Sequence, residues 1–189
     1  MTMYSSELED TVKEFPGFQV VRKSESRFMR LLAVLLFFNR SFMTDFTTTI
    51  GRYMWVPDVW ESWGDDAKCA VLRHERVHLR QQKRYGMVRY ALMYLLWPFP
   101  LFWARGRTAL EKEAYYESLQ AYADYYGDAF VQSKSLRKSF VGHFTTSEYG
   151  WMCTNSFEIE CWYDWAVDRI VHGPEVGTQN QYLRAKSKQ

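Results

Sequence analysis

The stretch "VLRHERVHLRQQ", Val71 to Gln82, contains two histidines four positions apart and a glutamate directly after the first. On a helix, residues four apart lie on one face, so His74 and His78 can both reach one zinc ion at about 2.0–2.1 Å. Glu75 lies about 100° round the helix from His74. From there its carboxylate can take a proton from a water on the zinc without binding the zinc itself. The alternative is that both histidines are hydrogen-bonded residues of an ordinary core.

The rest of this helix favours an inward position for the two histidines. We expect the helix to begin near Asp65, after capping residues in the stretch 62–66, and to end at Tyr85–Gly86. At about 100° per residue, small, apolar and amide side chains lie within about 80° of His74, and we predict that the basic residues opposite them face water. The inward set is Ala67, Ala70, Val71, His78, Gln81, Gln82 and Tyr85, and the basic set is Lys68, Arg73, Arg76, Arg80 and Lys83.

A catalytic zinc site needs a third protein ligand, and the best candidates lie in a second predicted helix, residues 108–126. Glu111 lies near the middle of its apolar half, whereas Glu113 and Glu117 lie on the opposite half. A carboxylate centred on an apolar face is costly unless a cation compensates it. For Glu111 that cation is zinc or, as the alternative, Arg107 one turn earlier.

These residues give the chain a resemblance to the gluzincins, zincin metallopeptidases in which two H-E-x-x-H histidines and a downstream glutamate hold zinc. His74, Glu75, His78 and Glu111 match that pattern, and "EKEAY" is similar to a stretch of the M48-like and ImmA/IrrE-like families. The resemblance covers about residues 46–127. It implies a zinc cofactor, a protein or peptide substrate, and Glu75 as the base that activates water.

The resemblance also implies three further roles. Tyr115 stands where many relatives have an Asp or Asn that supports a histidine, and its hydroxyl could take that role. The strand before the zinc helix, "TTTIGRYMWV", would bind extended substrate along its edge, or it is an ordinary sheet strand. Zincins often stabilise the tetrahedral oxyanion with a downstream Tyr or His, for which His143 and Tyr149 are the candidates.

The predicted fold class is α+β, a mostly helical zincin-like domain with a short sheet beside the H-E-x-x-H helix. We predict one domain over residues 1–189, with the zinc-site core at about 46–127 and a basic tail at about 180–189. Further expected elements are a buried helix over 26–39, one or two short strands over 45–60 bent at Gly51, a helix over 87–97 and a last helix over 157–171.

Composition limits the remaining choices. A chain of 189 residues that is 47% hydrophobic and 24% charged suits one globular domain. The net charge of +2, from scattered basic residues, makes no case for nucleic acid as a partner. The polar, acidic N-terminal stretch is no signal peptide, and three sparse cysteines form no disulfide framework, so we expect a cytoplasmic protein.

Two apolar segments fall short of the about 20 residues that a spanning helix needs. They are residues 31–38 and residues 91–104, the second interrupted by Pro98 and Pro100. Both are expected in the core, and the region Tyr90–Trp103 could also contact a membrane surface peripherally. The expected function is therefore a zinc-dependent metallopeptidase. The alternative is a non-catalytic, zinc-stabilised binding protein associated with a membrane surface; the oligomeric state stays open.

Overall fold

The computed structural model describes residues 2–35, 42–95, 105–146, 152–153 and 155–173. The chain divides into two compact units, Met1–Tyr90 and Ala91–Gln189. The described residues are mostly helical and include a three-stranded sheet, which confirms the predicted α+β class. That the whole chain forms a single domain stays a prediction.

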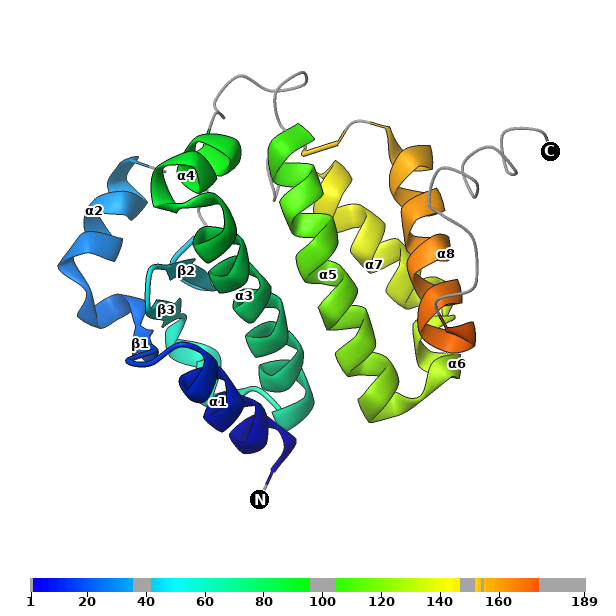
Figure 1. The fold of residues 1–189 in the computed structure, drawn as a ribbon, viewed down its shortest axis with the longest axis horizontal. Coiled ribbons are helices and arrows are strands. Elements are labelled where there is room, and N and C mark those ends of the chain that lie inside the picture. The colour runs from blue at the N-terminus through cyan, green and yellow to red at the C-terminus, as the bar shows by residue number, and fades with distance from the viewer. Residues whose placement is uncertain (1, 36–41, 96–104, 147–151, 154, 174–189) are drawn as a thin grey trace. The chain divides into compact units, whose positions relative to one another are not determined.

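The first unit carries the sheet and the helix of the H-E-x-x-H motif (Figure 1). Its elements are α1 (Met3–Glu14), β1 (Gln19–Arg22), the 3₁₀ helix η1 (Lys23–Glu25), α2 (Arg27–Leu35), β2 (Thr48–Ile50), β3 (Tyr53–Val56), the 3₁₀ helix η2 (Asp58–Ser62), α3 (Asp65–Tyr85) and the start of α4 (Met87–Leu95).

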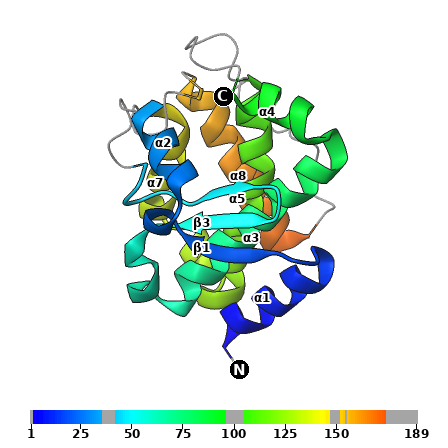
Figure 2. The ribbon, with the colours of Figure 1, turned by 90° about the vertical axis from the view of Figure 1, so that its left-hand side faces the viewer.

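The sheet has the strand order β1-β3-β2, with β1 parallel and β2 antiparallel to β3 (Figure 2). Gly51 adopts a φ of 61° in the turn between β2 and β3, which confirms two short strands bent at this glycine. Met54 and Val56 point to one side of β3 and share a buried cluster with Leu72 and Leu79 of α3. The sheet therefore lies beside the helix of the motif, as predicted.

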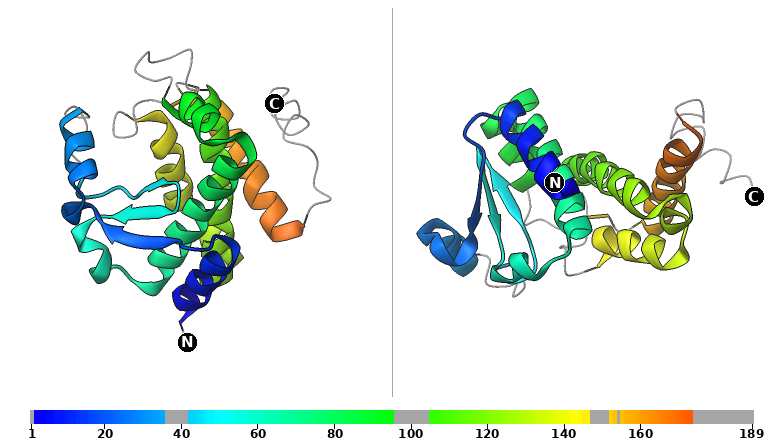
Figure 3. Two further views of the ribbon diagram at one scale, coloured as in Figure 1. Left: turned by 60° about the vertical axis from the view of Figure 1, so that its left-hand side comes forward. Right: turned by 90° about the horizontal axis from the view of Figure 1, so that it is seen from below.

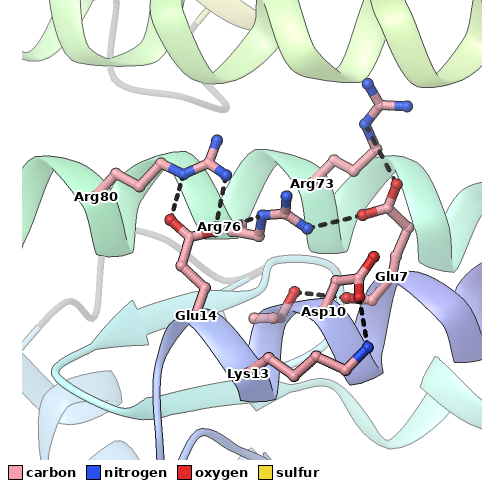
Figure 4. Close-up of polar contacts among 8 residues, drawn as sticks. Glu7, Asp10, Lys13, Glu14, Arg73, Arg76 and Arg80 are labelled. Carbon is pink, nitrogen blue, oxygen red and sulfur yellow. Dashed lines mark hydrogen bonds and ion pairs between the residues drawn. The ribbon is translucent and has the colours of Figure 1, made fainter.

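Helix α1 lies along the basic side of α3 and was not foreseen in the polar N-terminal stretch. Glu7 accepts a hydrogen bond from Arg76 at 2.9 Å, and Glu14 binds Arg80 at 2.7 Å and Arg76 at 3.1 Å (Figure 4). The prediction that the basic residues of α3 face water is wrong here, because the side chains of Arg73 and Arg76 are only 15% and 20% exposed. Two acids seven residues apart on α1 meet these arginines, so the charges are paired at a helix contact.

Helix α2 forms where a helix was predicted, but the expectation that it is buried is wrong. Met29 is fully buried, whereas Phe28, Leu31 and Val34 are 52%, 60% and 70% exposed. The helix carries apolar residues on more than one side, and only the side with Met29 is buried in the first unit. Residues 36–39 of the predicted helix lie outside the described residues.

The second unit contains the end of α4, α5 (Arg105–Tyr126), α6 (Asp128–Val131), α7 (Lys134–Thr145) and α8 (Ser156–His172), which Figure 3 shows from two further sides. Its core includes the buried residues Leu119, Phe144, Ile159 and Trp162. The helices expected over 108–126 and 157–171 are confirmed, and α7 was not predicted. Within the described ranges, no helix combines the length and apolar character needed to cross a bilayer.

Candidate metal centre

Helix α3 presents the three residues of the motif. It starts at Asp65 and ends where Gly86, with a φ of 76°, donates its N–H to the carbonyl of Gln82, so both predicted ends are confirmed. His78 and Glu75 are 4% and 5% exposed, and His74 is half-buried. The inward position is therefore confirmed for His78, while that of His74 stays a prediction.

The two imidazoles face each other on α3. Nε2 of His74 and Nε2 of His78 are 3.1 Å apart, and the ring planes cross at 80°. An ion bound tetrahedrally at about 2.0–2.1 Å from each nitrogen would hold the two nitrogens about 3.3–3.4 Å apart. The pair thus has the spacing of two ligands of one ion. A hydrogen bond between two neutral rings has nearly the same spacing, so the core-histidine alternative remains.

Gln81 supports His78 from the same helix. Its amide oxygen lies 2.9 Å from Nδ1 of His78, and Gln81 is fully buried. An amide oxygen only accepts, so Nδ1 carries the proton and Nε2 of His78 keeps its lone pair. An outer partner of this kind orients a metal-binding histidine. Sequence reasoning placed Gln81 on the inward face but assigned it no role, although its position three residues after His78 was the available signal.

The next residue, Gln82, ties α3 to the turn between β2 and β3. Its amide donates to the carbonyl of Thr49 at 3.0 Å and accepts from the N–H of Gly51 at 2.8 Å. The buried side-chain amide of Gln82 therefore bonds the main-chain groups of Thr49 and Gly51 at the end of β2, where no neighbouring strand in the described part of the chain does so. This contact fixes β2 beside the motif.

Glu75 points toward the segment that precedes β2. The hydroxyl of Thr47 donates a hydrogen bond to Oε1 of Glu75. A second polar neighbour is Lys23, which is fully buried and interacts electrostatically with Glu75. Burial lowers the pKa of Lys23 to about 8, and the negative charge of Glu75 opposes part of that shift. Neither Thr47 nor Lys23 was identified from the sequence.

Glu111 lies on α5 in the second unit. Its side chain is 4% exposed, whereas Glu113 is exposed and Glu117 is half-buried, so the predicted contrast between Glu111 and Glu113 is confirmed. The hydroxyl of Tyr94 donates to Oε1 of Glu111 at 2.6 Å. No spacing rule pointed to Tyr94.

Arg107, the alternative partner of Glu111, is also in this unit. Its guanidinium lies 4.9 Å from the centre of the Tyr94 ring. Burial lowers the pKa of Arg107, but electrostatic interactions with Tyr94 and Glu111 raise it, and the net direction is upward. Arg107 therefore compensates part of the charge of Glu111. Both a metal ion and Arg107 remain possible partners of this carboxylate.

Of the two candidates for oxyanion stabilisation, the structure describes only His143. Tyr149 lies outside the described residues. His143 is on α7, where its ring packs at 5.3 Å against Tyr115 and at 5.8 Å against Phe140. Tyr115, a candidate support for a histidine of the zinc site, also has its ring against Phe144 in this aromatic cluster. The oxyanion role of His143 and the histidine-supporting role of Tyr115 stay predictions.

Comparisons of the chain with protein-family models, curated proteins and solved structures found no match. The likeness to gluzincins consequently rests on His74, Glu75, His78 and Glu111.

Proposed function

We propose that the chain is a zinc-dependent hydrolase that cleaves peptide bonds, with His74, His78 and Glu111 as the zinc ligands. The observation that carries the proposal is the pair of Nε2 atoms 3.1 Å apart on α3, with the carboxylate of Glu75 buried on the same turn. His74, His78 and Glu111 are a group that could hold a metal ion, and these ligands are not specific to zinc. Zinc is preferred because two imidazoles and one glutamate form a ligand set of catalytic zinc sites.

The residues around the motif support distinct roles. A bound zinc ion would polarise the substrate carbonyl and lower the pKa of a water. Glu75 would accept the proton of the attacking water and return it to the leaving amine. The hydrogen bond from Thr47 holds one oxygen of Glu75 and leaves the other for that water. Gln81 keeps Nε2 of His78 available as a ligand.

Substrate binding is proposed along β2. In the order β1-β3-β2 this strand lies at an edge of the sheet, and it directly follows Thr47. An edge strand offers an extended peptide those main-chain N–H and C=O groups that are not already bonded, and on β2 Gln82 takes the carbonyl of Thr49. The proposed substrate is therefore an extended segment of a protein or peptide.

A second candidate function is a binding protein without catalysis. The electrostatic interaction of Arg107 with Glu111 favours it, because that pair could neutralise the buried carboxylate without a metal. In this case the histidine pair and Glu111 serve only the packing of their own helices. Metal content therefore tests this metal-free form of the binding protein, and hydrolysis by the zinc-loaded chain tests the zinc-stabilised form.

Metal content tests the site directly. We expect purified wild-type protein to hold one zinc per chain, measured by inductively coupled plasma mass spectrometry. His78→Ala and Glu111→Gln should each lose it, because three protein ligands are the usual minimum of a catalytic zinc site. Glu113→Gln, which changes an exposed glutamate two residues from Glu111 on α5, should retain it. A wild-type protein that holds no metal after purification and after incubation with zinc would exclude the proposed site.

The support of His78 by Gln81 is tested separately. We expect Gln81→Met to weaken zinc binding by about 10–100-fold, the range for removing an outer partner of a ligand histidine. The measurement is competition with a chromophoric chelator, with circular dichroism to check that α3 still folds. Gln120→Met changes an amide that binds Asp124 on α5 and should leave the affinity unchanged. Equal affinity of the Gln81 variant and wild type would show that the hydrogen bond does not orient His78.

A further inference from the structure

Helix α2 presents an apolar stripe to solvent. Phe28, Leu31 and Val34 recur every three residues and are more than half exposed, while Met29 anchors the helix in the first unit. Side chains three apart lie on one side of a helix, so the three form a continuous surface. Phe28 also contacts the ring of Trp55 at 6.1 Å, which joins the stripe to β3.

The charged residues of α2 are all cations. Arg27 and Arg30 are exposed, and α2 contains no acidic residue. Among the residues that the structure describes, neither arginine has an ion-pair partner; the nearest acid before the helix is Glu25. Two unpaired positive charges beside an apolar stripe match the chemistry of an anionic lipid surface.

The start of α4, in the same unit, also exposes apolar and cationic side chains. Met87 and Val88 are 42% and 75% exposed, and the guanidinium groups of Arg84 and Arg89 lie 5.8 and 5.7 Å from the centre of the Tyr85 ring. Figures 1 and 2, which differ by a turn about the vertical axis, both show α2 and the start of α4 toward the upper end of the first unit. Two apolar, cationic surfaces therefore lie toward one end of this unit.

This surface differs from the membrane contact expected over Tyr90–Trp103. Tyr90 is buried at 7% exposure, and its ring lies 6.2 Å from that of His78. Residues 96–103 lie outside the described part of the chain. The surfaces of α2 and of the start of α4 both consist of described residues alone.

We propose that α2 and the start of α4 dock the protein peripherally on membranes that contain anionic lipids. Phe28, Leu31 and Val34 enter the boundary between headgroups and acyl chains, and Arg27 and Arg30 bind lipid phosphates. A helix that exposes apolar side chains together with cations binds in this way without spanning the bilayer. The inference is independent of the proposed hydrolysis, because it uses neither the histidine pair nor Glu75.

Vesicle sedimentation with the full chain tests the proposal. Wild type should sediment with vesicles of equal parts phosphatidylcholine and phosphatidylglycerol, and far less with phosphatidylcholine alone or at high salt. Arg27→Gln with Arg30→Gln should weaken binding by about 25-fold, since each cation near an anionic surface contributes about fivefold. Leu31→Ser with Val34→Ser should also weaken binding, and it leaves the Phe28–Trp55 contact in place.

Matched controls change similar residues elsewhere. Val12→Ser with Val59→Ser removes two exposed apolar side chains, and Lys134→Gln with Lys138→Gln removes two exposed cations; both should bind as wild type does. Wild type that stays in solution with anionic vesicles overturns the proposal, as does a loss in the controls equal to that in the α2 variants. Self-association that Leu31→Ser with Val34→Ser abolishes, without vesicle binding, would instead assign this surface to a second copy of the chain.

Discussion

Glu75→Gln is expected to lower peptide hydrolysis by on the order of 10²–10⁴-fold while the protein keeps its zinc. Glutamine has nearly the shape of glutamate and can still accept the hydrogen bond from Thr47, but it cannot take a proton from water. His74 and His78 are unchanged, so the metal should stay. The measurement is turnover of a library of internally quenched peptides, with zinc content determined on the same samples.

The control for this variant is Glu113→Gln, which removes an exposed carboxylate from α5 and should retain full activity. Activity that survives in Glu75→Gln at full zinc content would contradict Glu75 as the base. Zinc-loaded wild type that cleaves no peptide would favour the binding protein, because the metal site would then be present without hydrolysis.

The second large effect concerns Lys23, whose side chain is fully buried. Its ammonium donates to the carbonyl of Phe42 and lies 3.9 Å from the centre of the Phe42 ring. Burial lowers the pKa of Lys23 to about 8 from 10.5, despite the nearby charge of Glu75. A shift of this size corresponds to about 3 kcal/mol of difference between the charged and neutral forms in the folded protein.

The sign of the pH dependence follows from this lowered pKa. Below about pH 8, Lys23 is charged in both states, and the folded protein carries the full cost of burying the ammonium. Between about pH 8 and 10.5 the unfolded chain binds more protons than the folded one, so the contribution of Lys23 to the free energy of unfolding rises with pH. Lys23→Met removes this contribution.

We therefore expect the unfolding free energy of wild type to rise by about 2.5 kcal/mol relative to that of Lys23→Met between pH 7 and 10. Urea denaturation followed by circular dichroism measures it, and the difference between the two proteins cancels other groups that titrate in this range. Lys138→Met removes an exposed ammonium on α7 and should parallel wild type at every pH. Parallel curves for Lys23→Met as well would show that Lys23 does not titrate as proposed.

Much of the local structure followed from sequence because it depends on residues close together along the chain. The spacing of His74 and His78, the bend at Gly51 and the end of α3 at Gly86 follow from helix geometry and backbone sterics. The same geometry separated Glu111 from Glu113, since burial of one helix side follows the apolar pattern.

What needed the tertiary structure were the contacts between residues far apart in the chain. The sequence by itself determined the helix that carries the motif, the α+β class and the burial of Glu111. Only the tertiary structure decided that α1 pairs the arginines of α3, that Thr47 and Lys23 face Glu75, and that Tyr94 binds Glu111. It also decided that the stripe on α2 stays exposed, because periodicity shows which side of a helix is apolar but not whether another element covers it.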